Sequence, residues 1–188
     1  MDEERENGVG KKILREGAHL IFYAAFVVLL TFFVVEYVGQ RTRVSGSSME
    51  PSLEDGDNLI VDKLSYRFRA PKRFEVIVFP SEIEEGKFYI KRIIGLPGET
   101  VRIDREGIIY IDGEELPESY GLEVIENPGT ALYETALKEG EYFVLGDNRN
   151  HSMDSRDENV GVILRDKIVG RAWLRIYPFN KFGWIRHD

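Results

Sequence analysis

Three short stretches of the chain contain side chains that can take part in nucleophilic chemistry. The first, "SGSSMEPSL" at 45–53, holds several serines, and the second, "FYIKRIIGLPGE" at 88–99, holds a lysine within an apolar run. The third, "LGDNRNHSMDSR" at 145–156, gathers carboxylate, amide, hydroxyl and guanidinium groups. A serine hydroxyl needs a base to accept its proton, and a lysine can be that base only if its amine is neutral. The protonation state of the lysine therefore determines whether it can act as this base.

Lys91 lies in a segment whose alternation is typical of a β-strand. One face carries Tyr89, Lys91 and Ile93, and the other carries Phe88, Ile90, Arg92 and Ile94. A lysine titrates near pH 10.4, and keeping it neutral near pH 7 requires a pKa lowered by about three units, or about 4 kcal/mol. A buried Lys91 would indicate a use for the free amine. The alternative is a Lys91 that reaches the edge of the strand and stays charged.

The serine stretch has the features of a constrained turn. Gly46 permits backbone dihedrals that are closed to other residues, and Pro51 stops the segment from continuing as a regular strand. Without a base nearby, serines in such a turn are structural. By composition alone, the stretch at 145–156 is likewise a polar loop held by its own hydrogen bonds.

In this order, the three stretches resemble those of the bacterial-type signal peptidase I family, membrane-anchored serine proteases with a Ser/Lys dyad. The serine motif of the family is matched by Ser48-Met49-Glu50-Pro51-Ser52-Leu53. Its lysine motif is matched by Lys91-Arg92 and the Gly-Leu-Pro-Gly turn at 95–98, and its third motif by residues 146–156. The resemblance runs from the N-terminal apolar segment to about Arg171, interrupted by an insertion.

The resemblance implies which serine reacts. Ser48 would be the nucleophile and Lys91 its general base, which leaves Ser45 and Ser47 as turn residues. Some members of the family carry a serine two residues before the nucleophile, where its hydroxyl helps to hold the oxyanion. This chain has Gly46 there, as other members do, so the oxyanion hole would rest on the Ser48 backbone N–H and a further donor from the fold.

The resemblance also implies supporting roles for the third stretch. Ser152 would orient the lysine amine through a hydrogen bond, and Asp154 would pair with Arg156 to stiffen the loop beneath it. An ion pair between Arg92 and Asp147 is expected on the same structural grounds.

His151 offers an alternative base in a Ser/His/Asp set. Family relatives that use histidine carry it in place of the lysine, and this chain has Lys91, which favours the lysine. The implied substrates are exported preproteins, whose signal peptides place small residues in shallow apolar pockets before the cleaved bond. The residues expected to line these pockets are Val44, Met49, Leu53, Tyr89 and Ile90.

The N-terminal apolar segment at 19–38 predicts a transmembrane anchor, because twenty residues of helix cross about 30 Å of hydrocarbon. The alternatives are a buried helix of a soluble protein and a cleaved signal peptide. The apolar segment is longer than that of a typical signal peptide, and no clear small-x-small cleavage site follows it. Residues 1–18 are expected to form a cytoplasmic tail, since basic residues before the span outnumber those that follow it closely. The predicted location is the plasma membrane, with the catalytic domain extracytoplasmic.

The rest of the chain, 39–188, predicts a mainly β fold: an antiparallel β catalytic domain behind one N-terminal transmembrane helix. Short runs rich in Val, Ile, Tyr and Phe alternate with turn residues. Residues 97–140 are expected to form a small insertion that contains a β-hairpin. The expected strands lie within 58–64, 74–79, 87–95, 100–104, 107–113, 141–146, 160–163 and 167–179.

An aromatic group near the C-terminus has two interpretations. Signal peptides arrive with their hydrophobic segment in the bilayer, so exposed aromatic side chains would place the domain at the membrane interface. Alternatively, these side chains belong to the core. They are Trp173, Tyr177, Phe179, Phe182 and Trp184.

Composition excludes several functions. The net charge of -8 argues against nucleic acid as a partner. The chain has no cysteine and three scattered histidines, so no cofactor and no cysteine-based metal site is expected. A self-cleaving repressor with a Ser/Lys dyad would need a soluble DNA-binding region where the apolar segment lies. A tethered extracytoplasmic binding module remains the non-enzymatic alternative. The expected partners are signal peptides and the lipid bilayer.

Overall fold

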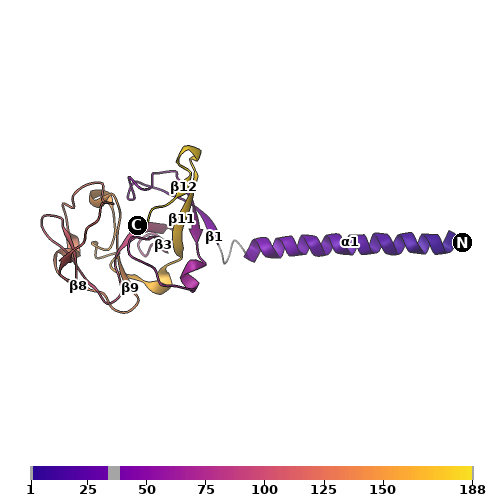
Figure 1. The fold of residues 1–188 in the computed structure, drawn as a ribbon, viewed down its shortest axis with the longest axis horizontal. Coiled ribbons are helices and arrows are strands. Elements are labelled where there is room, and N and C mark those ends of the chain that lie inside the picture. The colour runs from indigo at the N-terminus through magenta and orange to yellow at the C-terminus, as the bar shows by residue number, and fades with distance from the viewer. Residues whose placement is uncertain (1, 34–38, 188) are drawn as a thin grey trace. The chain divides into compact units, whose positions relative to one another are not determined.

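The computed structural model of the chain describes residues 2–33 and 39–187 (Figure 1). The chain divides into two compact units, with the boundary between Gly39 and Gln40. The first unit contains the helix α1 (Asp2–Phe33), and the second is a β domain. The mainly β fold class with one N-terminal apolar helix is therefore confirmed.

Helix α1 begins well before the apolar span that was expected at 19–38. It includes most of the charged segment predicted to be a tail, which is rich in the helix formers Glu, Lys and Arg. Its part Arg15–Phe33, 19 residues, is long and apolar enough to cross a membrane. That length corresponds to about 28 Å of helix. Residues 34–38 of the expected span lie outside the described residues.

The β domain is built around an eight-stranded sheet in the order β1-β2-β11-β3-β4-β9-β10, with β12 paired to β11. The pairings from β2 to β10 are antiparallel. The strands are β1 (Gly39–Arg43), β2 (Asn58–Asp62), β3 (Val76–Pro80), β4 (Phe88–Gly95), β9 (Glu141–Leu145), β10 (Ile163–Leu164), β11 (Gly170–Tyr177) and β12 (Gly183–Trp184).

A second, four-stranded sheet has the order β7-β6-β5-β8 and falls inside the segment 97–140. Its strands are β5 (Thr100–Ile103), β6 (Ile109–Ile111), β7 (Glu114–Glu115) and β8 (Thr135–Ala136). A separate group of buried side chains, including Val101, Ile103 and Leu137, packs around it. Short 3₁₀ turns lie at Ser65–Arg67, Gly129–Leu132, Arg149–His151, Arg165–Lys167 and Phe179–Lys181.

Strand β4 alternates as the sequence predicts. Ile90 packs in one core cluster with Val78, whereas Ile93 packs in another with Ile77. Lys91 pairs across the strands with Ile77 of β3. The lysine therefore lies on a strand that is anchored by apolar side chains on both faces.

The prediction of a strand at 160–163 is wrong for all of these residues except Ile163. The N–H groups of Val160 and Gly161 both donate to the carbonyl of Asp157, which turns the chain, and Gly161 has a φ of 57°. Consequently β10 begins only at Ile163.

Candidate active site

Ser48 and Lys91 meet although they lie far apart in the sequence. The Lys91 amine lies 2.7 Å from the Ser48 hydroxyl oxygen, within hydrogen-bond distance. Ser48 belongs to the turn between β1 and β2 and is half-buried. Lys91 is only 4% exposed, so the alternative in which it reaches solvent at the strand edge is wrong.

The surroundings of Lys91 favour its neutral form. Burial lowers the pKa of the amine to about 8, and the positive charge of Arg156 acts in the same direction. The carboxylates of Asp154 and Asp147 oppose the shift without cancelling it. With a pKa of about 8, about a tenth of the amine is unprotonated at pH 7, compared with less than about a thousandth for an ordinary lysine, and this fraction can act as the general base.

The turn that carries Ser48 is held by its own backbone. The Glu50 N–H donates to the Ser47 carbonyl at 3.0 Å, and the Leu53 N–H donates to the Met49 carbonyl at 2.8 Å. Gly46 has a φ of 89°, a conformation that L side chains rarely adopt. A glycine at this position therefore leaves the turn unstrained and supplies no hydroxyl beside Ser48.

The loop at 146–156 is stiffened by a buried ion pair. Asp154 accepts from the Arg156 Nε and Nη2 atoms at 2.8 and 2.9 Å, and from the Gly146 N–H at 3.0 Å. Arg156 also donates to the Arg149 carbonyl. The expected pairing of Asp154 with Arg156 is thus present and ties both halves of the loop together.

Ser152 does not make the expected hydrogen bond to the lysine. Its hydroxyl is buried and has no hydrogen-bond partner among the described residues. The side chain packs against Gly146, where an added Cβ atom would lie 2.2 Å from the Ser152 Oγ atom. The close approach at Gly146 holds the serine near the site, but its hydroxyl does not orient the amine in this structure.

The Arg92–Asp147 pair lies directly behind the site. Two hydrogen bonds of 2.8 and 2.7 Å join the two side chains. Arg92 also donates to the Ser52 hydroxyl at 3.2 Å. The pair therefore connects β4, the serine turn and the loop that follows β9.

A groove of about 430 Å³ opens over Ser48 and Lys91. Four of the five expected pocket residues line it: Val44, Met49, Tyr89 and Ile90. Leu53 does not; it is fully buried in the core cluster that also contains Met49. Leu53 therefore packs in the core with the groove residue Met49 and does not itself face the groove.

His151 is exposed, and among the described residues its imidazole makes no hydrogen bond to Ser48. The hydroxyl of Ser48 instead lies beside Lys91. The geometry thus disfavours the Ser/His/Asp alternative. Among the described residues, the His, Asp and Glu side chains form no group of three that could hold a metal ion.

Comparison with known proteins agrees with this arrangement. A family model described as signal peptidase, peptidase S26, matches residues 15–177. The chain belongs to this family. It is accordingly a serine peptidase of the signal peptidase I type.

Several relatives of this peptidase are signal peptidases by name. The probable signal peptidase I-2 of Synechocystis sp. is 38% identical over 86% of this chain and 73% of its own. Signal peptidase I T of Bacillus subtilis is 34% identical over 96% of this chain and 97% of its own. A crystal structure of a signal peptidase I from Enterococcus faecalis, 36% identical, covers 55% of this chain and 97% of its own, with a TM-score of 0.45.

The groove of the peptidase contains residues that the sequence did not single out. Glu84 and Lys87 come from the hairpin between β3 and β4, and Met153 comes from the loop after β9. The Tyr89 hydroxyl lies 3.3 Å from Glu84 and 3.5 Å from the Met153 sulfur. These exposed residues have no periodicity that would mark them, because their position depends on how the hairpin and the loop meet.

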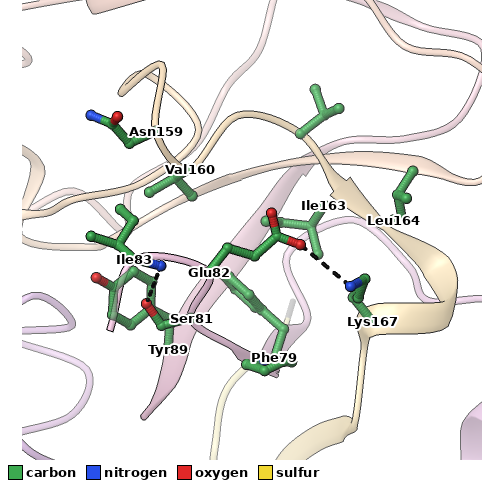
Figure 2. Close-up of a pocket in the computed structure, with 12 residues that line it drawn as sticks. Phe79, Ser81, Glu82, Ile83, Tyr89, Asn159, Val160, Ile163, Leu164 and Lys167 are labelled. Carbon is green, nitrogen blue, oxygen red and sulfur yellow. Dashed lines mark hydrogen bonds and ion pairs between the residues drawn. The ribbon is translucent and has the colours of Figure 1, made fainter. Parts of the chain in front are cut away.

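A smaller cavity of about 130 Å³ adjoins the groove and shares Tyr89 with it. Figure 2 shows its apolar wall, with Glu82 and Lys167 facing each other at the rim, 3.4 Å apart. Neither Ser48 nor Lys91 lines this cavity. It is therefore a separate hollow behind Tyr89.

The aromatic group near the C-terminus is on the surface of the peptidase, so its interpretation as core is wrong. Phe179 is 81% exposed, and Trp184 is 65% exposed. The rings of Trp173 and Trp184 lie 4.8 Å apart, at the pairing of β11 with β12. The exposed group comprises Trp173, Tyr177, Phe179, Phe182 and Trp184, called the aromatic surface below.

Proposed function

We propose that this chain is a membrane-bound serine endopeptidase that removes N-terminal signal peptides from exported preproteins, with Ser48 as nucleophile and Lys91 as general base. The observation that carries the proposal is the 2.7 Å contact between the Lys91 amine and the Ser48 hydroxyl. Because the amine is buried and its pKa is lowered to about 8, it can accept a proton from the hydroxyl.

Acylation requires one proton to move twice. The Ser48 oxygen attacks the substrate carbonyl while its proton passes to the Lys91 amine, and a tetrahedral oxyanion forms. The ammonium then returns the proton to the departing nitrogen, the carbon–nitrogen bond breaks, and the mature protein leaves with a free amino terminus. The signal peptide remains attached to Ser48 as an ester.

Deacylation repeats the sequence with water. The neutral Lys91 amine accepts a proton from a water molecule as its oxygen attacks the ester carbonyl. The proton then returns to the Ser48 oxygen as the carbon–oxygen bond breaks, which releases the signal peptide as a carboxylate. A histidine is not needed, because one lysine serves both half-reactions.

The groove suits a substrate with small side chains before the cleaved bond. Val44, Met49 and Ile90 are nearly buried and present only a shallow apolar surface beside Ser48. Small side chains fit such a surface, whereas bulky ones would be held away from the nucleophile.

The apolar part of α1, Arg15–Phe33, would serve as the membrane anchor. In the proposed topology the N-terminus is cytoplasmic and the β domain is extracytoplasmic. The aromatic surface then supports contact between the β domain and the lipid interface, where Trp and Tyr side chains are favoured. This contact would hold the β domain near the bilayer from which the substrate arrives.

The activity is tested with the full chain in liposomes and a preprotein whose cleavage is followed by gel shift and mass spectrometry. Ser48→Ala and Lys91→Ala should each abolish release of the signal peptide while circular dichroism stays unchanged. Lys138→Ala, an exposed lysine, and His151→Ala serve as controls and should cleave normally. Normal cleavage by a folded Ser48→Ala or Lys91→Ala variant would refute the dyad.

Topology can be measured separately because the chain has no cysteine. Single cysteines introduced at Glu3 and at Lys138 are exposed in turn to a membrane-impermeant maleimide in intact cells. Labelling at position 138 and none at position 3 is expected. The reverse pattern would overturn the proposed orientation.

A further inference from the structure

Asn148, in the loop after β9, donates two hydrogen bonds to the backbone of the turn that carries Ser48. Its side-chain Nδ2 donates to the Ser47 carbonyl at 3.2 Å, and its backbone N–H donates to the Ser48 carbonyl at 3.1 Å. Asn148 is only 4% exposed. Both atoms that it contacts are acceptors, so the carboxamide must present its NH₂ group, not its oxygen, to Ser47.

The carbonyl of Ser47 belongs to the same peptide unit as the N–H of Ser48. That peptide is planar and trans, since the described cis bonds are at other positions, so its C=O and N–H point in opposite directions. Two donors, Asn148 Nδ2 and the Glu50 N–H, hold the Ser47 oxygen. Holding the oxygen therefore also fixes the direction of the Ser48 N–H.

Among the described residues, the Ser48 N–H makes no backbone hydrogen bond. Gly46 supplies no hydroxyl to share the task of holding an oxyanion. Hydrogen bonds to the Ser47 oxygen also polarise the peptide and strengthen the N–H as a donor. Orientation and polarisation of this one group thus both depend on the loop that carries Asn148.

We propose that Asn148 is a positioning residue that preorganises the Ser48 N–H to hold the oxyanion of the tetrahedral intermediate. This inference rests on the proposed function, because it requires Ser48 to attack a carbonyl. Preorganised donors act on the charge that develops during the reaction and not on the ground state. Asn148 should therefore affect the rate of the chemical step and leave substrate binding unchanged.

The loop is built to bring Asn148 this close. Gly146, two residues earlier, lies so near the serine turn that an added Cβ atom would be 2.4 Å from the Ser48 carbonyl oxygen. The neighbouring Asp147 is held by Arg92. The position of Asn148 is therefore set by the two residues that directly precede it.

The test uses the full chain in liposomes with Asn148→Ala, and Asn148→Asp, which keeps the shape but replaces the donor with an acceptor. Asn159→Ala removes an exposed amide and is the matched control. Four quantities are measured: kcat, KM, the pH profile of kcat/KM, and the affinity for a peptide aldehyde compared with the same peptide amide. The aldehyde forms a tetrahedral adduct on a serine, whereas the amide reports ground-state binding only.

Loss of an oxyanion donor typically costs about 10²–10³ in kcat, and loss of a group that orients one is expected to cost about 10 to 100-fold. Asn148→Ala should lower kcat and aldehyde affinity by that factor, with KM, amide affinity and the acidic limb of the pH profile unchanged. Asn148→Asp should lose more activity than Asn148→Ala, and Asn159→Ala should match the unmodified chain.

Two results would overturn the inference. One is a folded Asn148→Ala with normal kcat and aldehyde affinity. The other is an equal loss of aldehyde and amide affinity, or a shifted acidic limb, either of which would indicate a loosened site. If Asn148→Asp fails to fold, Asn148→Ala decides alone. Activity in Ser48→Ala would instead refute the proposed function itself, so the two failures are distinguishable.

Discussion

Arg92 and Asp147 form an ion pair that is almost completely buried, with side chains 1% and 0% exposed. Arg92 extends this pair to three further segments, because its guanidinium donates to the Ser52 hydroxyl, the Phe74 carbonyl and the Arg186 carbonyl. The pair is therefore the junction where the serine turn, the lysine strand, the loop after β9 and the C-terminal segment meet.

Removing one partner of this pair should destabilise the chain strongly. Asp147→Asn leaves the Arg92 charge buried without its counter-charge, and the expected loss in the free energy of unfolding is about 3–5 kcal/mol. Chemical denaturation measures it. Glu82→Gln, which breaks an exposed pair with Lys167, is the control and should change stability by less than about 1 kcal/mol. Equal small effects in both variants would contradict the role of the buried pair.

Gly146→Ala should damage the site through a steric clash. The new Cβ atom would lie 2.2 Å from the Ser152 Oγ atom and 2.4 Å from the Ser48 carbonyl oxygen. Because a displacement of about 1 Å in a reacting group can cost about 10²-fold, we expect a comparable loss in kcat/KM. Gly183→Ala, where an added Cβ meets nothing within 4 Å, should keep full activity.

Activity should rise with pH as Lys91 loses its proton. The pKa of the buried amine is lowered to about 8, so kcat/KM should increase about tenfold per pH unit below that value and level off above it. Steady-state cleavage of a peptide substrate between pH 6 and 9 measures this limb. A limb near the pKa of histidine, about 6.5, would point to a different base.

Lys91→Met should stabilise the chain at neutral pH while abolishing catalysis. The folded pKa, about 8, lies below the ordinary value of 10.5, so the folded state binds fewer protons than the unfolded state between these values. Stability conferred by Lys91 therefore rises with pH up to 10.5 and is lowest below 8. Thermal unfolding at pH 7 should show a gain of about 1–3 kcal/mol for the variant. The gain should vanish above pH 10.5; a constant difference would refute the cause given.

The aromatic surface should enter the lipid interface. The chain has two tryptophans, Trp173 and Trp184, and both belong to this surface, so selectively excited tryptophan fluorescence reports on it alone. In liposomes of brominated phospholipids the emission should be quenched relative to ordinary phospholipids. Single variants Trp173→Phe and Trp184→Phe assign the signal, with the larger quenching expected for the more exposed Trp184. Unquenched emission would place the surface in water.

Local pattern in the sequence determined much of the fold and of the candidate site. Alternation along 88–95 placed Lys91 on an apolar face because side chains of a strand point to opposite sides at every step. The apolar run at 19–38 predicted a helix long enough to cross a membrane through length and composition, which are also local properties, and Arg15–Phe33 forms such a helix. The choice of Ser48 among three serines came from the motif around it. The expected strand at 160–163 failed because apolar alternation there is overridden by a turn at Asp157.

Only the tertiary structure decided how the separate stretches meet. It placed Leu53 in the core instead of the groove, turned Ser152 toward Gly146, and brought Met153 to the rim beside Tyr89. It also set Asn148 against the Ser47 carbonyl, a contact between residues 101 positions apart. Such contacts depend on the order and register of strands that are distant in the chain, whereas periodicity in the sequence constrains only the direction of a side chain from its own strand.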